Sequence, residues 1–140
     1  MPFPAIRHCL VCDDVRQEVN RKTTILGFYG ITPNVGILIR DFEKPIGGLM
    51  FVLLTEAVKD AGKFKITPRL LKPNGEALAD LPTIEVPITV SQVQTQVGFA
   101  LGTVKFPHPG IYSFVLLVDE REHYQTTFSV EQGKPEDFND

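Results

Sequence analysis

Apolar and polar residues alternate along several segments of this chain, and a period of two is typical of β-strands with one buried face. The alternation is clearest over residues 63–71, where Phe64, Ile66 and Leu70 share one side. Residues 83–90 alternate as well, but Pro87 lacks the N–H that a central strand must donate, so we expect this strand at a sheet edge. Further strands are predicted at residues 6–13, 22–29, 37–40, 48–56 and 97–101.

The last two alternating segments lie on either side of residues 119–123 and predict a β-hairpin. Its register follows because the apolar faces of the two strands must lie on the same side of the sheet. A loop over residues 119–123 would bring these faces together and pair Phe114 with Phe128. Val115 and Leu117 are then left on the opposite face of the first strand. That face needs cover from another element or another subunit.

The strand predicted at residues 22–29 alternates in the same way. We expect Thr24, Leu26 and Phe28 to face the core, with Ile25 and Tyr29 facing outward. Together with the apolar stretch over residues 48–54, these outward side chains make several strands apolar on both faces.

These segments predict an all-β fold, a single antiparallel β-sandwich of eight or nine strands with little helix. The segment Gly110-Ile111-Tyr112-Ser113-Phe114 resembles the G-x-Y-x-F stretch of immunoglobulin-like domains, which favours a sandwich of that or a similar type. We expect one domain over residues 1–131 and a flexible acidic tail over residues 132–140.

Composition narrows the class of protein further. The chain has 140 residues and a formal net charge of −3, with 43% hydrophobic and 22% charged residues, as expected of one globular domain. The mildly acidic balance gives no electrostatic reason to expect nucleic acid or an anionic membrane as a partner. No secretory signal or membrane-spanning segment is recognised, and only two cysteines occur, so we expect a cytoplasmic protein.

The two cysteines lie in the segment His8-Cys9-Leu10-Val11-Cys12, the one with the most reactive side chains. Thiolates bind metals and act as nucleophiles, so His8, Cys9 and Cys12 are the candidate residues for a metal site or a redox pair. The chain has no second C-x-x-C, and positions 9 and 12 of an extended strand point to opposite faces. We therefore favour two buried structural cysteines and expect no bound metal or other cofactor.

Carboxylates gather at two places. Asp13 and Asp14 follow the first predicted strand, and Asp119, Glu120 and Glu122 lie at the tip of the last hairpin. Calcium needs six to eight converging oxygens, so we favour a solvated turn at the hairpin tip and local bonding to the backbone at Asp13 and Asp14. The alternative for the first cluster is a binding surface formed by Asp13, Asp14 and Arg16.

The segments Cys12-Asp13-Asp14 and Ile25-Leu26-Gly27-Phe28-Tyr29 resemble the opening of a family of small uncharacterised bacterial proteins. That family joins a Cys-Asp segment through a Gly-Lys turn to an apolar strand ending in Gly-aromatic. Here Asn20-Arg21-Lys22 occupies the turn without the glycine. The resemblance implies a bacterial domain of unknown function and identifies no catalytic residue.

No arrangement of residues suited to catalysis is recognised, so we expect a non-enzymatic binding or structural module. Its partner is predicted to be a second copy of the chain or another protein. The surplus of apolar strand faces motivates this prediction, with Ile25, Tyr29, Val115 and Leu117 as the interface residues. The alternative is a small metal- or ligand-binding protein, or an enzyme, that uses His8, Cys9 and Cys12.

Overall fold

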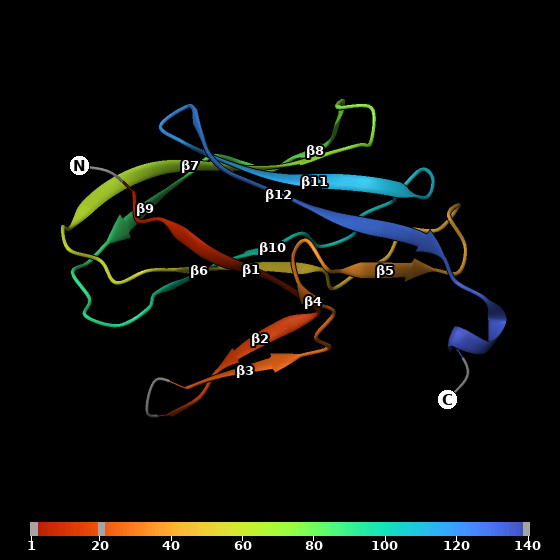
Figure 1. Cartoon of the computed structure of the whole chain (residues 1–140), viewed down its shortest axis with the longest axis horizontal. Coiled ribbons are helices and arrows are strands. Elements are labelled where there is room, and N and C mark those ends of the chain that lie inside the picture. The colour runs from red at the N-terminus through yellow and green to blue at the C-terminus, as the bar shows by residue number, and fades with distance from the viewer. Residues whose placement is uncertain (1–2, 20–21, 139–140) are drawn as a thin grey trace.

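The computed structural model describes residues 3–19 and 22–138 (Figure 1), and within these residues the chain is all-β, as predicted. The strands, in chain order, are β1 (Ile6–Cys12), β2 (Asp14–Gln17), β3 (Thr23–Leu26), β4 (Gly30–Ile31), β5 (Gly36–Ile39), β6 (Met50–Thr55), β7 (Gly62–Leu71), β8 (Ala77–Asp80), β9 (Ile84–Ile88), β10 (Gln96–Ala100), β11 (Gly110–Val118) and β12 (Arg121–Gln132). A short 3₁₀ turn, η2 (Pro135–Phe138), follows β12. No helix in the described part of the chain is long and apolar enough to cross a membrane.

The strands form three sheets. A four-stranded sheet has the order β10-β6-β1-β4 and a six-stranded sheet has the order β5-β12-β11-β7-β8, with β9 also paired to β7. The third sheet contains only β2 and β3, and we call this two-stranded unit the arm. All strand pairs are antiparallel except β5 and β12, which run parallel.

The main core lies between the four-stranded and the six-stranded sheet. Phe51 of β6 stacks on Phe114 of β11 with ring centroids 4.7 Å apart, and Phe128 of β12 packs against the same Phe51 ring. All three side chains are buried, because alternate residues of each strand point into this layer. Large aromatic rings therefore join the two sheets across their centre.

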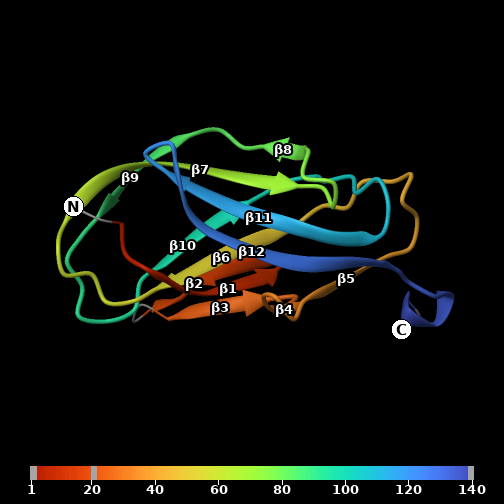
Figure 2. The same ribbon diagram turned by 45° about the horizontal axis from the view of Figure 1, so that its top comes forward.

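The arm covers the outer face of the four-stranded sheet (Figures 1 and 2). Val15 of β2 packs against a second, smaller cluster in which Leu10, Cys12 and Val52 are buried. Met50 and Leu54 of β6 border the same cluster. The second apolar face of β6 is thus covered by a segment of the same chain.

The predicted sandwich is confirmed only as an all-β fold. The structure has three sheets and a parallel β5–β12 pair, so a single antiparallel sandwich of eight or nine strands does not describe it. The predicted edge position of residues 83–90 is confirmed, since β9 pairs with β7 alone. Pro87 lies opposite Lys63 and leaves its missing N–H at the outer edge.

The register predicted for the last hairpin is wrong by two residues. Phe114 lies opposite Thr126, and Phe128 pairs with Tyr112. The hairpin closes through only two residues, Asp119 and Glu120, which both have positive φ, and a register shift follows beside Leu116. Such a turn matches the right-handed twist of the strands better than a five-residue loop does.

The expected orientation of β3 is only partly correct. Ile25 lies opposite Val15 and so shares the face of the arm that is turned toward the four-stranded sheet. It is nevertheless 39% exposed, as expected for a residue outside the core. Phe28 lies after the end of β3 and is 55% exposed, not part of the core. The alternation of apolar and polar residues alone does not reveal that β3 pairs with β2 and that this pair folds over the four-stranded sheet. Two residues of the predicted turn, 20 and 21, lie outside the described residues.

The 3₁₀ turn η2 brings the segment after β12 against the body of the protein. The Arg40 guanidinium lies 5.1 Å above the centre of the Phe138 ring, and the Cβ of a side chain at Gly133 would collide with that ring. This cation–π contact places residues 133–138 beside the end of β5.

Candidate functional site

The two cysteines of β1 lie in different cores. Cys9 belongs to the main core and Cys12 to the cluster beneath the arm, while His8 is exposed. Burial raises the pKa of the Cys9 thiol to about 12, and burial followed by the charges of Asp13 and Asp14 raises that of Cys12. Both thiols are therefore neutral at neutral pH, a state poorly suited to nucleophilic attack or metal binding.

The structure does not bring His8, Cys9 and Cys12 together as ligands. Across residues 3–19 and 22–138, no three His, Cys, Asp or Glu side chains are close enough to hold a metal ion. Cys9 and Cys12 are also free thiols.

Asp13 marks the junction where β1 passes into the arm. Its N–H donates to the carbonyl oxygens of Leu26 (3.0 Å) and Gly27 (3.1 Å). Gly27 has φ of +60°, and a Cβ there would collide with the Asp13 carboxyl group. Burial, together with the charge and hydrogen bonding of Asp13, raises the pKa of Tyr29. Asp13, Gly27 and Tyr29 thus form a compact junction at the base of the arm.

The other two residues of the predicted acidic surface lie on the arm itself. The Asp14 carboxylate accepts a hydrogen bond from the N–H of Val15 at 2.8 Å, and Arg16 is exposed opposite Thr24. The Asp14 carboxylate therefore bonds locally to the backbone of its own strand.

The four predicted interface residues do not form one surface. Ile25 and Tyr29 belong to the arm and its base, whereas Val115 and Leu117 lie on the outer face of the six-stranded sheet. Val115 is only 5% exposed, and within that sheet it lies between Gln125 of β12 and Arg69 of β7. The two pairs of residues are on opposite sides of the molecule.

The free edge of β10 is a feature that the sequence did not indicate. β10 is the last strand of the four-stranded sheet, and among residues 3–19 and 22–138 it pairs only with β6. At the two ends of this pairing, Thr55 N–H donates to Thr95 and Leu101 N–H donates to Leu49. Since hydrogen-bonding residues alternate along an antiparallel strand, the odd-numbered residues of β10 face β6. The backbone N–H and C=O groups of Gln96, Gly98 and Ala100 therefore point to the open edge.

β10 carries none of the usual protection of an edge strand. Its sequence, Gln-Val-Gly-Phe-Ala, has no charged residue and no proline. The edge strand β9 of the other sheet carries both, in Glu85 and Pro87. Charges and prolines on an edge prevent the addition of further strands, so β10 is open to strand pairing in a way that β9 is not.

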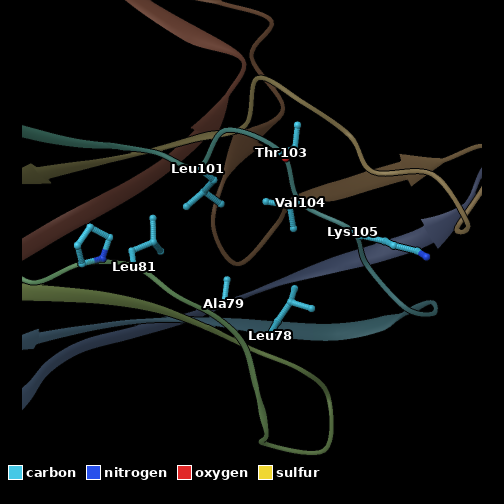
Figure 3. A pocket seen from close by; sticks show the side chains of 8 residues that line it. Leu78, Ala79, Leu81, Leu101, Thr103, Val104 and Lys105 are labelled. Atoms are coloured by element: carbon cyan, nitrogen blue, oxygen red, sulfur yellow. The ribbon is translucent and has the colours of Figure 1, made fainter.

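An apolar groove continues from the end of β10. It has a volume of about 400 Å³, and its lining residues come from β8, the segment after β8, and the segment after β10. Figure 3 shows Leu78 and Leu81 on one side, with Leu101 and Val104 opposite. Lys105 lies at one end of the groove, where its ammonium is 3.9 Å from a Glu43 carboxylate oxygen. The groove thus opens between the edges of the two larger sheets.

The edge and groove define an all-β domain in which one edge strand, β10, has an open outer edge beside an apolar hollow. Residues 7–131 match the model of DUF6941, described as a family of unknown function, and the chain belongs to this family. This confirms the predicted membership of an uncharacterised family. No curated protein matches the chain.

Several solved structures resemble part of the chain. One of them is titled Pseudomonas fluorescens alkylpurine DNA glycosylase AlkC bound to DNA containing an abasic site analog, with 14% sequence identity and a TM-score of 0.38. The likeness covers 71% of this chain and 28% of the glycosylase chain, so the chain spans less than a third of the protein it resembles.

The predicted partners are contradicted. The sequence favours self-association and argues against nucleic acid, whereas one of the structures that the chain resembles is bound to DNA. The predicted interface also separates onto two sides of the molecule, and the arm covers the second face of β6. Both the exclusion of nucleic acid and the prediction of self-association are withdrawn. A TM-score of 0.38 does not in turn assign DNA binding to this chain.

Proposed function

We propose that this chain is a non-enzymatic binding module that takes an extended peptide segment of another protein as an added strand on β10. The observation that carries the proposal is the unprotected β10 edge, which ends at an apolar groove. Strand addition to an open sheet edge is a recurrent mode of peptide recognition, in which backbone hydrogen bonds supply affinity and side-chain pockets supply specificity.

The backbone of β10 supplies the polar part of this interaction. Gln96, Gly98 and Ala100 each direct one donor and one acceptor to the open edge, so a paired peptide forms up to about six hydrogen bonds. Each such bond contributes roughly 0.5–1.5 kcal/mol after the loss of bonds to water. Six bonds contribute at most about 9 kcal/mol before the entropy lost on binding is subtracted, so measurable affinity also requires the apolar contacts of the groove.

The groove supplies the apolar part. Alternate side chains of an added strand point to the same side as Phe99 of β10, which is buried in the main core. Those nearest the end of β10 enter the hollow between Leu78 and Val104. We therefore expect a peptide with apolar residues at every second position.

We further propose that the two larger sheets form an immunoglobulin-like sandwich. The Tyr112 hydroxyl, near the start of β11, donates to the carbonyl oxygen of His108 at 2.6 Å. This bond has the form of the tyrosine corner of such domains. In this interpretation β10 is an outer strand with no partner on its far side, which supports its role as the binding edge.

The proposal is tested with a defined peptide of alternating threonine and valine, flanked by lysines and labelled with a fluorophore. Saturable binding by fluorescence anisotropy is expected for the peptide. A peptide of the same composition with consecutive N-methylated residues at its centre should not bind, because both of its edges are blocked. A single-stranded DNA oligonucleotide serves as the second probe, and binding of DNA in place of the peptide would overturn the proposal.

The variant Ala100→Pro tests the site. Proline at this position removes an N–H that points away from β6, so the pairing with β6 is retained. Peptide affinity should fall about tenfold, while Ala100→Ser, which keeps the N–H, should bind as the parent does. Unchanged peptide affinity in a folded Ala100→Pro protein would place the peptide elsewhere and refute the proposed edge.

A further inference from the structure

The arm is the one part of the described chain that forms a sheet by itself. β2 pairs only with β3, through the register Asp14–Leu26 to Gln17–Thr23. A two-stranded hairpin is marginally stable in water when nothing packs against it. The ordered state of the arm therefore depends on its contacts with the four-stranded sheet.

Among the described residues, the contacts of the arm with the body are few, and they lie at its two ends and on one face. Val15 packs on the cluster around Leu10, Cys12 and Val52. Farther along the arm, the Gln96 side-chain amide donates to the Thr23 hydroxyl at 2.5 Å. At its base the arm joins the body through the Asp13–Gly27 junction described above.

We propose that the arm is a hinged cover that opens as a unit about the Asp13–Gly27 junction while the rest of the fold stays closed. The small contact area is the first support, because segments with few buried apolar contacts open at a lower free-energy cost than the global core. The left-handed backbone of Gly27 is the second, since glycine adopts this conformation at little cost where the chain leaves β3. Opening uncovers the outer apolar face of β6 and releases Gln96 on β10.

The positions of the two thiols make this motion measurable. Cys12 lies beneath the arm, in the small cluster, whereas Cys9 lies between the two larger sheets. Both side chains are fully buried, so neither reacts in the closed protein. Arm opening exposes Cys12 alone, and only global unfolding exposes Cys9.

The experiment measures alkylation by iodoacetamide, in which the thiolate forms the carbon–sulfur bond and iodide leaves. The protein Cys9→Ala reports the rate at Cys12, and Cys12→Ala reports the rate at Cys9. We expect Cys12 to react at least about tenfold faster than Cys9 and still far more slowly than the same thiol in urea-unfolded protein. Each rate is divided by that of its own unfolded form, which removes differences in intrinsic reactivity.

A pair of variants on the arm separates hinged opening from general instability. Val15→Ala removes the contact with the small cluster and should accelerate alkylation of Cys12 about tenfold, with the Cys9 rate changed less. Thr24→Ala, on the opposite face of β3, is the matched control and should leave both rates near the parent values. Equal protection of Cys9 and Cys12, Cys12 reacting as fast as in unfolded protein, or no response to Val15→Ala would each overturn the proposal.

Discussion

The burial of Cys9 makes the stability of this protein depend on pH in the alkaline range. Its side chain is fully buried, and its pKa is raised from an ordinary value of 9.0 to about 12. A group whose pKa is higher in the folded state stabilises the fold below its unfolded pKa, and this contribution is lost as the pH rises toward the folded pKa. At about pH 10 most of the unfolded thiol is ionised, while the buried thiol is still neutral. The free energy of unfolding therefore falls by about 1.4 kcal/mol between about pH 7 and about pH 10 through Cys9 alone.

The substitution Cys9→Ala isolates this contribution. Urea unfolding followed by circular dichroism, with a reducing agent present, gives the free energy of unfolding of parent and variant at both pH values. The variant is less stable at neutral pH because alanine leaves a small cavity, but that loss is the same at both pH values and cancels from the difference. We expect the variant to lose about 1.4 kcal/mol less than the parent on going to the higher pH. Equal losses in the two proteins would show that the Cys9 thiol is not held in a desolvated site.

Three further substitutions test the junction, the Tyr112 hydrogen bond and the core, each by urea unfolding. Gly27→Ala should cost about 1–2 kcal/mol from its left-handed backbone alone, and more from the collision with Asp13; a neutral effect would contradict the geometry of the arm base. Tyr112→Phe removes the bond to His108 and should cost about 0.5–1.5 kcal/mol, and no loss would mean that water replaces that bond. Phe51→Ala should cost about 3–5 kcal/mol because the ring is fully buried, and less than about 1 kcal/mol would place it outside the main core.

The parts of the fold that follow local rules could be predicted from the sequence. Alternation located β7, and Pro87 correctly placed β9 at a sheet edge. The opposite directions of Cys9 and Cys12 follow from strand geometry alone, and the structure places them in separate cores. In each case the signal is contained in a few consecutive residues.

The parts that depend on pairing between distant segments could not be predicted in this way. The apolar faces of the last hairpin are predicted correctly. Its register, however, depends on the backbone of Asp119 and Glu120, which have positive φ although neither is glycine. The parallel pairing of β5 with β12 joins residues about 90 positions apart and has no local signature. The open edge of β10 has no local signature either, because it depends on whether another strand pairs beside β10. The lack of charge and proline in residues 96–100 was the one available signal for this edge.

The arm gives a different explanation for the strands that are apolar on both faces. Double-sided strands require cover, and the sequence left open whether the cover is another element or another subunit. For β6 the structure supplies an element of the same chain, since Val15 lies over Val52 and Cys12. Apolar residues on both faces of a strand therefore do not require a second protein when a hairpin elsewhere in the chain is long enough to fold back. The same hairpin leaves the backbone edge of β10 uncovered. In the described part of the chain it contributes to this strand the bond between Thr23 and Gln96. Recognition through β10 then depends on unpaired N–H and C=O groups rather than on the apolar surplus, which is why the proline and N-methyl tests bear directly on function.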